Sequence, residues 1–151
     1  MESQGVFFLN FVKVRENAIV PKKATEGSAG WDLHACLDRE ITLEHGDLVK
    51  VPCGIAIELP KGFAAFIFAR SGLGIKHGII PSNAVGVIDS DYRGEIQVGL
   101  CRIGKGEPYK ISAGDRIAQM VVIKVSNFSL KECEILNQTE RGTSGFGASG
   151  K

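Results

Sequence analysis

The sequence lacks a surplus of charge of either sign. Eighteen Lys and Arg residues face seventeen Asp and Glu residues, which gives a formal net charge of +1. A broad basic face for duplex DNA or anionic lipid is not expected from this balance, whereas a small local cluster around phosphates is compatible with it. We therefore expect no stable nucleic-acid or membrane partner.

Long hydrophobic runs and metal-binding cysteine spacings are also missing. The apolar run 6–12 is interrupted by Asn10 and is far shorter than the ~20 residues that span a bilayer. We expect a soluble protein that is not secreted, located in the cytoplasm, or in the nucleus if the source is a eukaryote or a virus. The four cysteines form no Cys-x-x-Cys pair and are expected to be buried thiols: Cys36, Cys53, Cys101 and Cys133.

The sequence also lacks a sustained apolar stripe at helical spacing. Period-two patterns and short β-branched runs dominate instead. The expected strands, separated by turns rich in Gly, Pro and Asp, are 6–14, 29–35, 48–51, 55–59, 63–69, 85–88, 96–102, 116–125 and 134–136. This pattern predicts an all-β, jelly-roll-like barrel or sandwich. Only 71–76 is expected to form a helical turn, capped by Ser71 and ended by Gly78.

Glycine, by contrast, is abundant, with 19 residues in the chain. The segment 141–151 is rich in it and cannot build a core of its own, so we divide the chain into a β domain, 1–140, and a flexible arm, 141–151. A frayed terminus fits this composition. So does a binding strip, because Arg141 can bind a phosphate, Phe146 can cover a flat ring, and glycine backbone can wrap an anion.

Two segments suit phosphate chemistry. Residues 69–74 follow an apolar strand and open the helical turn, so free N–H groups and the Arg70 guanidinium suit an anion; a plain strand-to-helix corner with a solvated Arg is the alternative. Asp89 ends the apolar run 85–88. A partly shielded carboxylate there suits a general base, worth ~10²–10⁴ in rate, although an ordinary turn rich in Asp and Ser fits the same residues.

Three further polar residues have two interpretations each. Asp32 lies inside the expected strand 29–35 and is either a second functional carboxylate or an Asp on the exposed face. Gln119 interrupts an apolar run, so its amide is expected to bond either backbone or a ligand. Asn83 fits a turn residue, or a side chain that presents its amide to the edge of a base.

In combination and in this order, five motifs resemble the trimeric deoxyuridine triphosphatases (dUTP diphosphatases). They are 27–33, 69–73, 86–94, 114–119 and 141–147, and the similarity extends over 27–150. The resemblance implies a jelly-roll subunit in a homotrimer, with active sites at the subunit interfaces and a C-terminal arm exchanged between subunits that closes over the nucleotide. The implied reaction converts dUTP and water into dUMP and pyrophosphate, which supplies dUMP for thymidylate synthesis and limits uracil in DNA.

The resemblance also implies roles for individual residues. Asp89 would activate the water that attacks the α-phosphate, and Mg²⁺ would bind the triphosphate, with Asp32 reaching the ion through water. Tyr92 would pack against the sugar and reject a ribose hydroxyl. The other substrate-binding residues would be Arg70, Ser71, Gly72, Gln119, Arg141, Ser144 and Gly147 around the phosphates, and Asn83, Gly86, Val87, Ile88, Gln97 and Phe146 around the uracil.

Departures from the family pattern are few. Trp31, Ala69 and Gly74 stand where Tyr, Pro and Ala are usual, and the loss of Pro at position 69 is expected to loosen the phosphate loop. The related dCTP deaminases are the first alternative, but they carry a Glu well inside the strand after the catalytic turn. Here 96–100 contains none, and Glu95 lies at its start. A jelly-roll trimer that binds nucleotides without turnover is the second alternative.

Overall fold

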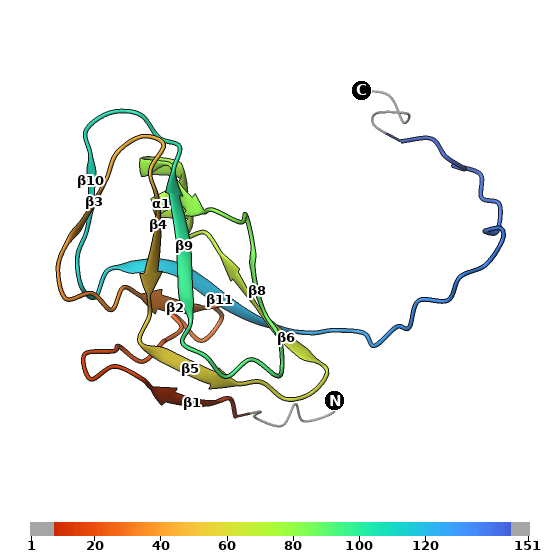
Figure 1. Ribbon diagram of the computed structural model, residues 1–151, viewed down its shortest axis with the longest axis horizontal. Helices are drawn as coiled ribbons and strands as arrows, with labels where there is room; N and C mark the ends of the chain where they lie inside the picture. The colour runs from red at the N-terminus through yellow and green to blue at the C-terminus, as the bar shows by residue number, and fades with distance from the viewer. Residues whose placement is uncertain (1–7, 146–151) are drawn as a thin grey trace.

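Short antiparallel strands make up most of the computed structural model, which describes residues 8–145 (Figure 1). One helix, α1 (Ser71–His77), is present in this range. The strands are β1 (Asn10–Lys13), β2 (Trp31–His34), β3 (Ile41–Leu43), β4 (Leu48–Pro52), β5 (Ile55–Glu58), β6 (Phe63–Phe68), β7 (Ile79–Pro81), β8 (Gly86–Ile88), β9 (Gln97–Arg102), β10 (Tyr109–Ile111) and β11 (Arg116–Lys124).

The strand order brings distant parts of the chain together. One sheet has the order β2-β11-β6-β8 and another β4-β9-β7, while β1 pairs with β5 and β10 with β3. Every strand pairing is antiparallel. This non-sequential order of short strands is typical of a jelly roll. The predicted all-β, jelly-roll-like fold is therefore confirmed.

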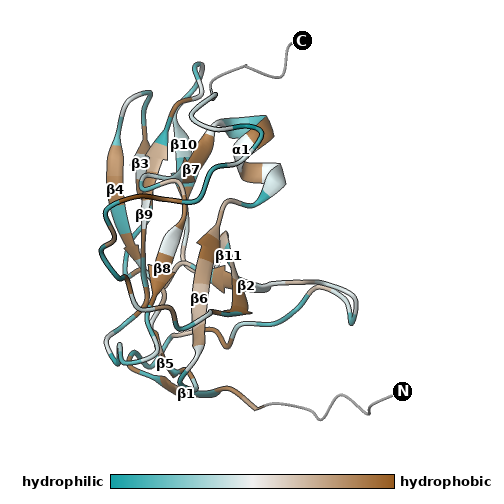
Figure 2. Cartoon of the chain, turned by 90° about the vertical axis from the view of Figure 1, so that its right-hand side faces the viewer, coloured by the Kyte–Doolittle hydropathy of each residue, from teal (hydrophilic) through white to brown (hydrophobic). Residues whose placement is uncertain are grey.

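The core forms because alternate residues of the strands turn inward. In β9, Val98, Leu100 and Arg102 are buried, while Gln97, Gly99 and Cys101 are more exposed. Figure 2 shows hydrophobic residues concentrated on the strands, including β6 and β8, and hydrophilic residues on the connecting loops. Leu33, Val51 and Ile111 are fully buried and contribute to one hydrophobic cluster.

Several local predictions were wrong. The three-residue strands β3, β7 and β10 were not predicted, and the expected strand 134–136 is absent, since 125–145 contain no helix or strand. Ser71 does not cap α1: Arg70 occupies the N-cap position and its side chain makes no capping hydrogen bond. Gly78 does end the helix, with φ 62°. Such short strands carry too few residues for a period to be recognised.

The prediction of buried thiols holds for only part of the set. Cys36 and Cys53 are buried, Cys101 is half-buried and Cys133 is exposed. Burial raises the pKa of the Cys53 thiol to about 12 because a thiolate is disfavoured in apolar surroundings. Among residues 8–145, none of the helices has the length and apolar character to cross a membrane.

Gly54, in the turn between β4 and β5, is a position that only glycine fits. Its φ is +71°, and a Cβ there would lie 2.6 Å from Ala18 Cβ and 2.7 Å from Cys36 Sγ. We expect Gly54→Ala to lower the free energy of unfolding by about 3 kcal/mol, through strain in the left-handed region together with overpacking. Urea denaturation measures the loss. Gly62→Ala is the matched control, because φ is +86° there but nothing lies within 4 Å, so about 1 kcal/mol is expected; equal losses would contradict the packing argument.

Candidate functional site

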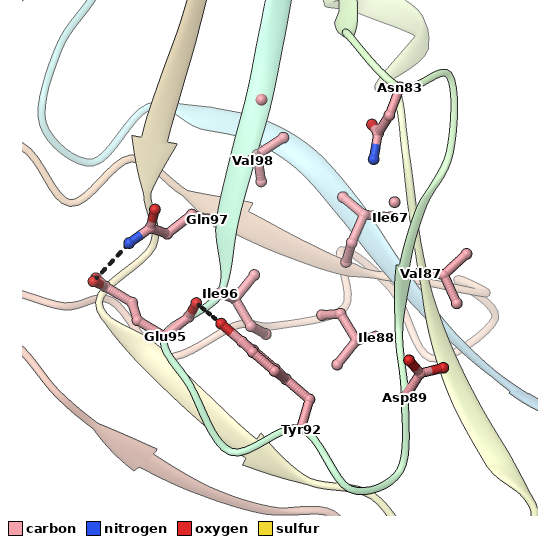
Figure 3. Close-up of a pocket in the computed structure, with 12 residues that line it drawn as sticks. Ile67, Asn83, Val87, Ile88, Asp89, Tyr92, Glu95, Ile96, Gln97 and Val98 are labelled. Carbon is pink, nitrogen blue, oxygen red and sulfur yellow. Dashed lines mark hydrogen bonds between the residues drawn. The ribbon is translucent and has the colours of Figure 1, made fainter.

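A cavity of about 330 Å³ opens between β8 and β9 (Figure 3). Ile67 of β6 and Val98 of β9 form part of its apolar wall, and Glu95 lies to the left of it in this view. Six of the residues predicted to bind the nucleoside line it together with Asp89, the predicted base: Asn83, Gly86, Val87, Ile88, Tyr92 and Gln97. The structure therefore brings this group of predicted residues together.

Strand β8 offers free backbone groups to this cavity. It pairs with β6 and stands at the end of its sheet, so one side of its backbone has no ladder partner within the described part of the chain, 8–145. Such an edge presents N–H and C=O groups that can bond a second strand or a ligand. Gly86 packs closely on β6, because a Cβ there would lie 3.1 Å from Ile67 Cβ. A planar ring can approach the edge without meeting a side chain at this position.

Asn83 is both a turn residue and a cavity residue. It follows β7, and its carbonyl accepts a hydrogen bond from the Val85 N–H at 2.7 Å. The next residue, Ala84, has φ 62°, an uncommon conformation for a residue other than glycine. Figure 3 shows the Asn83 amide pointing into the space between β8 and β9. The two interpretations of this residue are thus compatible.

Asp89 lies at the rim of the cavity, where β8 ends. Its side chain shares the outer face of the strand with Val87, which is 58% exposed, whereas Ile88 turns into the core (Figure 3). Asp89 itself is exposed. The expectation of a partly shielded carboxylate is wrong, because among residues 8–145 no strand pairs with β8 on this flank and the side chain is exposed.

A second group of predicted residues surrounds Asp32 on β2. Its Oδ1 accepts a hydrogen bond from Arg70 Nε at 3.1 Å, and its Oδ2 accepts one from Arg116 Nη1 at 3.2 Å. The Asp32 side chain is 16% exposed. The interpretation as an exposed-face Asp is therefore wrong. Both carboxylate oxygens position cationic side chains, and the Arg70 guanidinium is held half-buried at the end of β6.

Gln119 completes this group from β11, which pairs with both β2 and β6. Its Nε2 donates a hydrogen bond to the Ala69 carbonyl at 2.9 Å. The amide thus bonds the backbone, the first of its two predicted alternatives. This bond fastens the residue just before Arg70, at the position where the family usually has Pro.

Ser71 and Gly72 form the exposed first turn of α1. The first N–H groups of a helix have no carbonyl partner within it, and no acidic residue lies in this turn. These N–H groups and Arg70 together give a positive, accessible corner. The structure is consistent with the expected anion-binding segment here.

The cavity residues, which include Asp89, and the group around Asp32, which includes Arg70, lie far apart within one chain. In the antiparallel pairing of β6 with β8, Ala65 faces Ile88, so Asp89 falls beside Ala64. Arg70 is six positions further along the β6 segment, which corresponds to roughly 20 Å in an extended chain. This separation exceeds the length of one triphosphate. Asp89 and Arg70 therefore lie at opposite ends of the β6 segment within one chain.

The C-terminal segment lies away from both groups. After β11 the chain leaves the body of the protein (Figure 1), and 126–145 are exposed. Arg141 Nε donates a hydrogen bond to the Ser144 carbonyl at 3.0 Å, so these two residues lie together but contact neither group. Phe146 and Gly147 lie outside the described residues.

Glu95 is the polar cavity residue that the sequence analysis did not assign to the site. The Arg15 guanidinium holds the pKa of its carboxyl below the usual value, more strongly than partial burial raises it. The sequence feature that could have identified Glu95 as a site residue was its position directly after the turn motif 86–94. Its bond to Arg15, 80 positions away, could not be read from the sequence.

The comparison with known families decides the classification. A family model described as dUTPase matches residues 16–150. The chain belongs to the dUTPase family. A deoxyuridine 5'-triphosphate nucleotidohydrolase of Desulfitobacterium hafniense is 52% identical over 132 residues, which are 87% of each chain. One from Burkholderia mallei is 44% identical over 144 residues, or 95% of this chain and 97% of that one.

Solved dUTPase structures share the fold. A dUTPase variant of Staphylococcus bacteriophage 80alpha, solved with dUpNHpp, superposes with a TM-score of 0.83 at 23% identity and covers 97% of this chain and 100% of that chain. A dUTPase variant of phage phi11 of S. aureus, described with a structural Mg(II) ion, has a TM-score of 0.77 at 23% identity and covers 85% and 98%. Both support the jelly-roll-like architecture.

The described residues fit a magnesium ion held mainly by substrate. Within 8–145, no group of three or more His, Cys, Asp or Glu side chains could enclose a metal. In kinases, ATPases and polymerases, Mg²⁺ keeps several waters and takes its remaining oxygens from substrate phosphates and one or two carboxylates. Asp32 already accepts hydrogen bonds from two arginines, which matches a contact through water better than direct ligation.

Proposed function

We propose that this chain hydrolyses dUTP to dUMP and pyrophosphate, with the deoxyuridine in the cavity between β8 and β9. The observation that carries the proposal is the free edge of β8 beside the Asn83 amide, in a cavity rimmed by the Asp89 carboxylate. Backbone and amide groups there can pair with the uracil edge as a base would. Membership of the dUTPase family supports the same assignment.

Pyrimidine selectivity follows from the same edge. Cytosine carries an amino donor where uracil carries an acceptor, so it would leave buried polar groups unpaired and be rejected strongly. The close packing of Gly86 on Ile67 supports a tight fit with no room for the thymine methyl. Tyr92 packs against the sugar and excludes a ribose hydroxyl by bulk.

Hydrolysis proceeds by attack of a water on the α-phosphorus, in line with the departing pyrophosphate. Asp89 positions this water and accepts its proton. Arg70 and the N–H groups of Ser71 and Gly72 bind the phosphates, with Gln119 supporting this corner. When bound, Mg²⁺ neutralises charge on the triphosphate, and Asp32 would hold it through water.

The active site is completed by other copies of the chain. The outward direction of Asp89 and its distance from Arg70 support a homotrimer in which one copy supplies the nucleoside cavity and a neighbour the phosphate corner.

The exposed C-terminal segment supports an arm, 141–151, that leaves the domain 1–140 and closes over a neighbour's site. Arg141, Ser144 and Gly147 would then bind the γ-phosphate, and Phe146 would stack on uracil. A cytoplasmic or nuclear location, with no stable nucleic-acid or membrane partner, fits a nucleotide-pool enzyme.

Product analysis tests this function directly. Pyrophosphate and ammonia release are measured with Mg²⁺ and equal concentrations of dUTP, dCTP, dTTP and UTP. We expect pyrophosphate mainly from dUTP, with little from the other three nucleotides, and loss of the activity when EDTA removes the metal. Ammonia from dCTP would indicate a deaminase, although β9 carries no carboxylate; binding of dUTP without turnover would indicate a nucleotide sensor.

A further inference from the structure

One carboxylate, that of Glu95, joins three separate parts of the fold. Its Oε1 accepts hydrogen bonds from Arg15 Nε at 2.6 Å and from the Gly54 N–H at 2.9 Å. Its Oε2 accepts hydrogen bonds from Arg15 Nη2 at 3.1 Å and from Gln97 Nε2 at 3.4 Å. Glu95 therefore ties the segment after β1 and the β4–β5 turn to the first residue of β9.

The same residue also fixes Tyr92. The Tyr92 hydroxyl donates a hydrogen bond to the Glu95 carbonyl at 3.0 Å. The ring runs from the turn after β8 toward Glu95 (Figure 3) and lies over Gly94, where any side chain would collide with the hydroxyl. Tyr92 is nevertheless 46% exposed, so packing alone holds it weakly. Its orientation depends on where the Glu95 backbone is placed.

The segment that carries these residues has few other anchors. Its backbone bonds are a turn bond from the Tyr92 N–H to the Asp89 carbonyl at 3.2 Å and two links at Ile96. The Ile96 N–H donates to the Ile55 carbonyl at 2.8 Å, and the Ile96 carbonyl accepts from the Cys53 N–H at 2.9 Å. Within the segment, Arg93 Nη1 donates hydrogen bonds to the Ser90 carbonyl at 2.7 Å and the Tyr92 carbonyl at 3.0 Å. Outside it, Arg93 reaches Glu58 in an ion pair at 3.6 Å in which both side chains are about half exposed. The Arg15–Glu95 pair is shorter, two-pronged and more enclosed, with the Glu95 side chain 16% exposed.

We propose that Glu95, clamped by Arg15, is a positioning residue that sets the sugar and base selectivity of the cavity by fixing Tyr92 and Gln97. This inference rests on the proposed function, because it takes the cavity to hold deoxyuridine. Glu95 does not touch the reacting atoms. A small displacement of Tyr92 would open space at the sugar, and small displacements of positioning groups have large effects on discrimination.

A role in stability alone is a weaker account of this pair. The Arg15 side chain is 39% exposed, and partly exposed ion pairs contribute little to folding. A Glu carboxyl is ionised at neutral pH, and the Arg15 guanidinium lowers its pKa further. The clamp is therefore present under the conditions in which the enzyme would work.

The test compares Glu95→Gln with the wild-type protein, using steady-state kinetics on dUTP and UTP and thermal unfolding. Gln keeps an acceptor for the Gly54 N–H but loses the charge that binds Arg15. We expect KM for dUTP to rise roughly tenfold with kcat within about twofold, and the ratio of kcat/KM for dUTP to that for UTP to fall roughly tenfold.

Arg15→Lys, which keeps the charge but not the two-pronged geometry, should give an intermediate ratio. Tyr92→Phe should also lower the ratio, because it removes the hydroxyl bonded to the Glu95 carbonyl.

Glu58→Gln is the matched control, since it weakens the other ion pair of the same segment and should leave both kinetic constants unchanged. The inference is overturned if Glu95→Gln keeps the wild-type selectivity, or if kcat falls in parallel with thermal stability while KM and selectivity stay constant. An equal loss of selectivity in Glu58→Gln would also overturn it. If the wild-type protein releases no pyrophosphate from dUTP, the proposed function is wrong and this inference is wrong with it. If the wild type is active and Glu95→Gln keeps the wild-type ratio of kcat/KM for dUTP to that for UTP, only the inference is wrong.

Discussion

Asp89→Asn is expected to lower kcat for dUTP hydrolysis by about 10²–10⁴-fold, the usual contribution of a general base. The amide has nearly the shape of the carboxylate but cannot accept the proton of the attacking water. Because Asp89 lies on the exposed rim of the cavity and no hydrogen bond or ion pair of its side chain is found among residues 8–145, thermal stability should change little. Continuous measurement of pyrophosphate release, with KM determined separately, checks the prediction.

Asp91→Asn is the matched control for this variant. Asp91 is an exposed carboxylate two positions further along the same turn and does not line the cavity. It should retain wild-type kcat and KM. Activity of Asp89→Asn near the wild-type level would refute the assignment of the base, and an equal loss in both variants would point to the turn as a whole rather than to one carboxylate.

Mixing two inactive variants is expected to restore activity. In a homotrimer whose sites take Asp89 from one copy and Arg70 from another, Asp89→Asn and Arg70→Ala each disable every site. After the two are unfolded and refolded together in equal amounts, about a quarter of the sites should contain both intact residues. Activity should therefore reappear at about a quarter of the wild-type level. The reason lies in the roughly 20 Å along β6 that separates the two side chains in one subunit.

The control for this experiment refolds Asp89→Asn with the double variant Asp89→Asn/Arg70→Ala, which offers no intact Asp89 and should remain inactive. Native mass spectrometry verifies that mixed trimers have formed. Mixed trimers without recovered activity would show that both residues act within one copy. A monomer in solution would contradict the proposed assembly itself.

The sequence was sufficient for the fold class but not for every element. Runs such as 63–69 and 116–125 alternate long enough to be recognised as strands, and both were found within one residue of the predicted bounds, as β6 and β11. Strands of three residues, such as β7, depend on pairing with distant partners rather than on a local period. The expected strand 134–136 fails for the same reason, because no neighbour in the described chain pairs with it.

The candidate site was predicted in its residue types more than in its arrangement. Residue order and motif identified Asn83, Asp89 and Tyr92, and the structure places all three at one cavity. What the sequence could not reveal is that Arg70 lies at the opposite end of β6, because this follows from the register of β6 against β8. The pairing of Asp32 with two arginines likewise depends on contacts across strands.

The uneven burial of the four thiols has a practical consequence for following the C-terminal segment. Cys133 is exposed within that segment, whereas Cys53 is buried. The pKa of the Cys53 thiol, about 12, leaves almost no reactive thiolate of that residue near neutral pH. A maleimide fluorophore would therefore label Cys133 first. With Cys101 changed to Ser to remove the half-buried competitor, the emission of this dye would report the approach of the tail to a neighbouring subunit in real time.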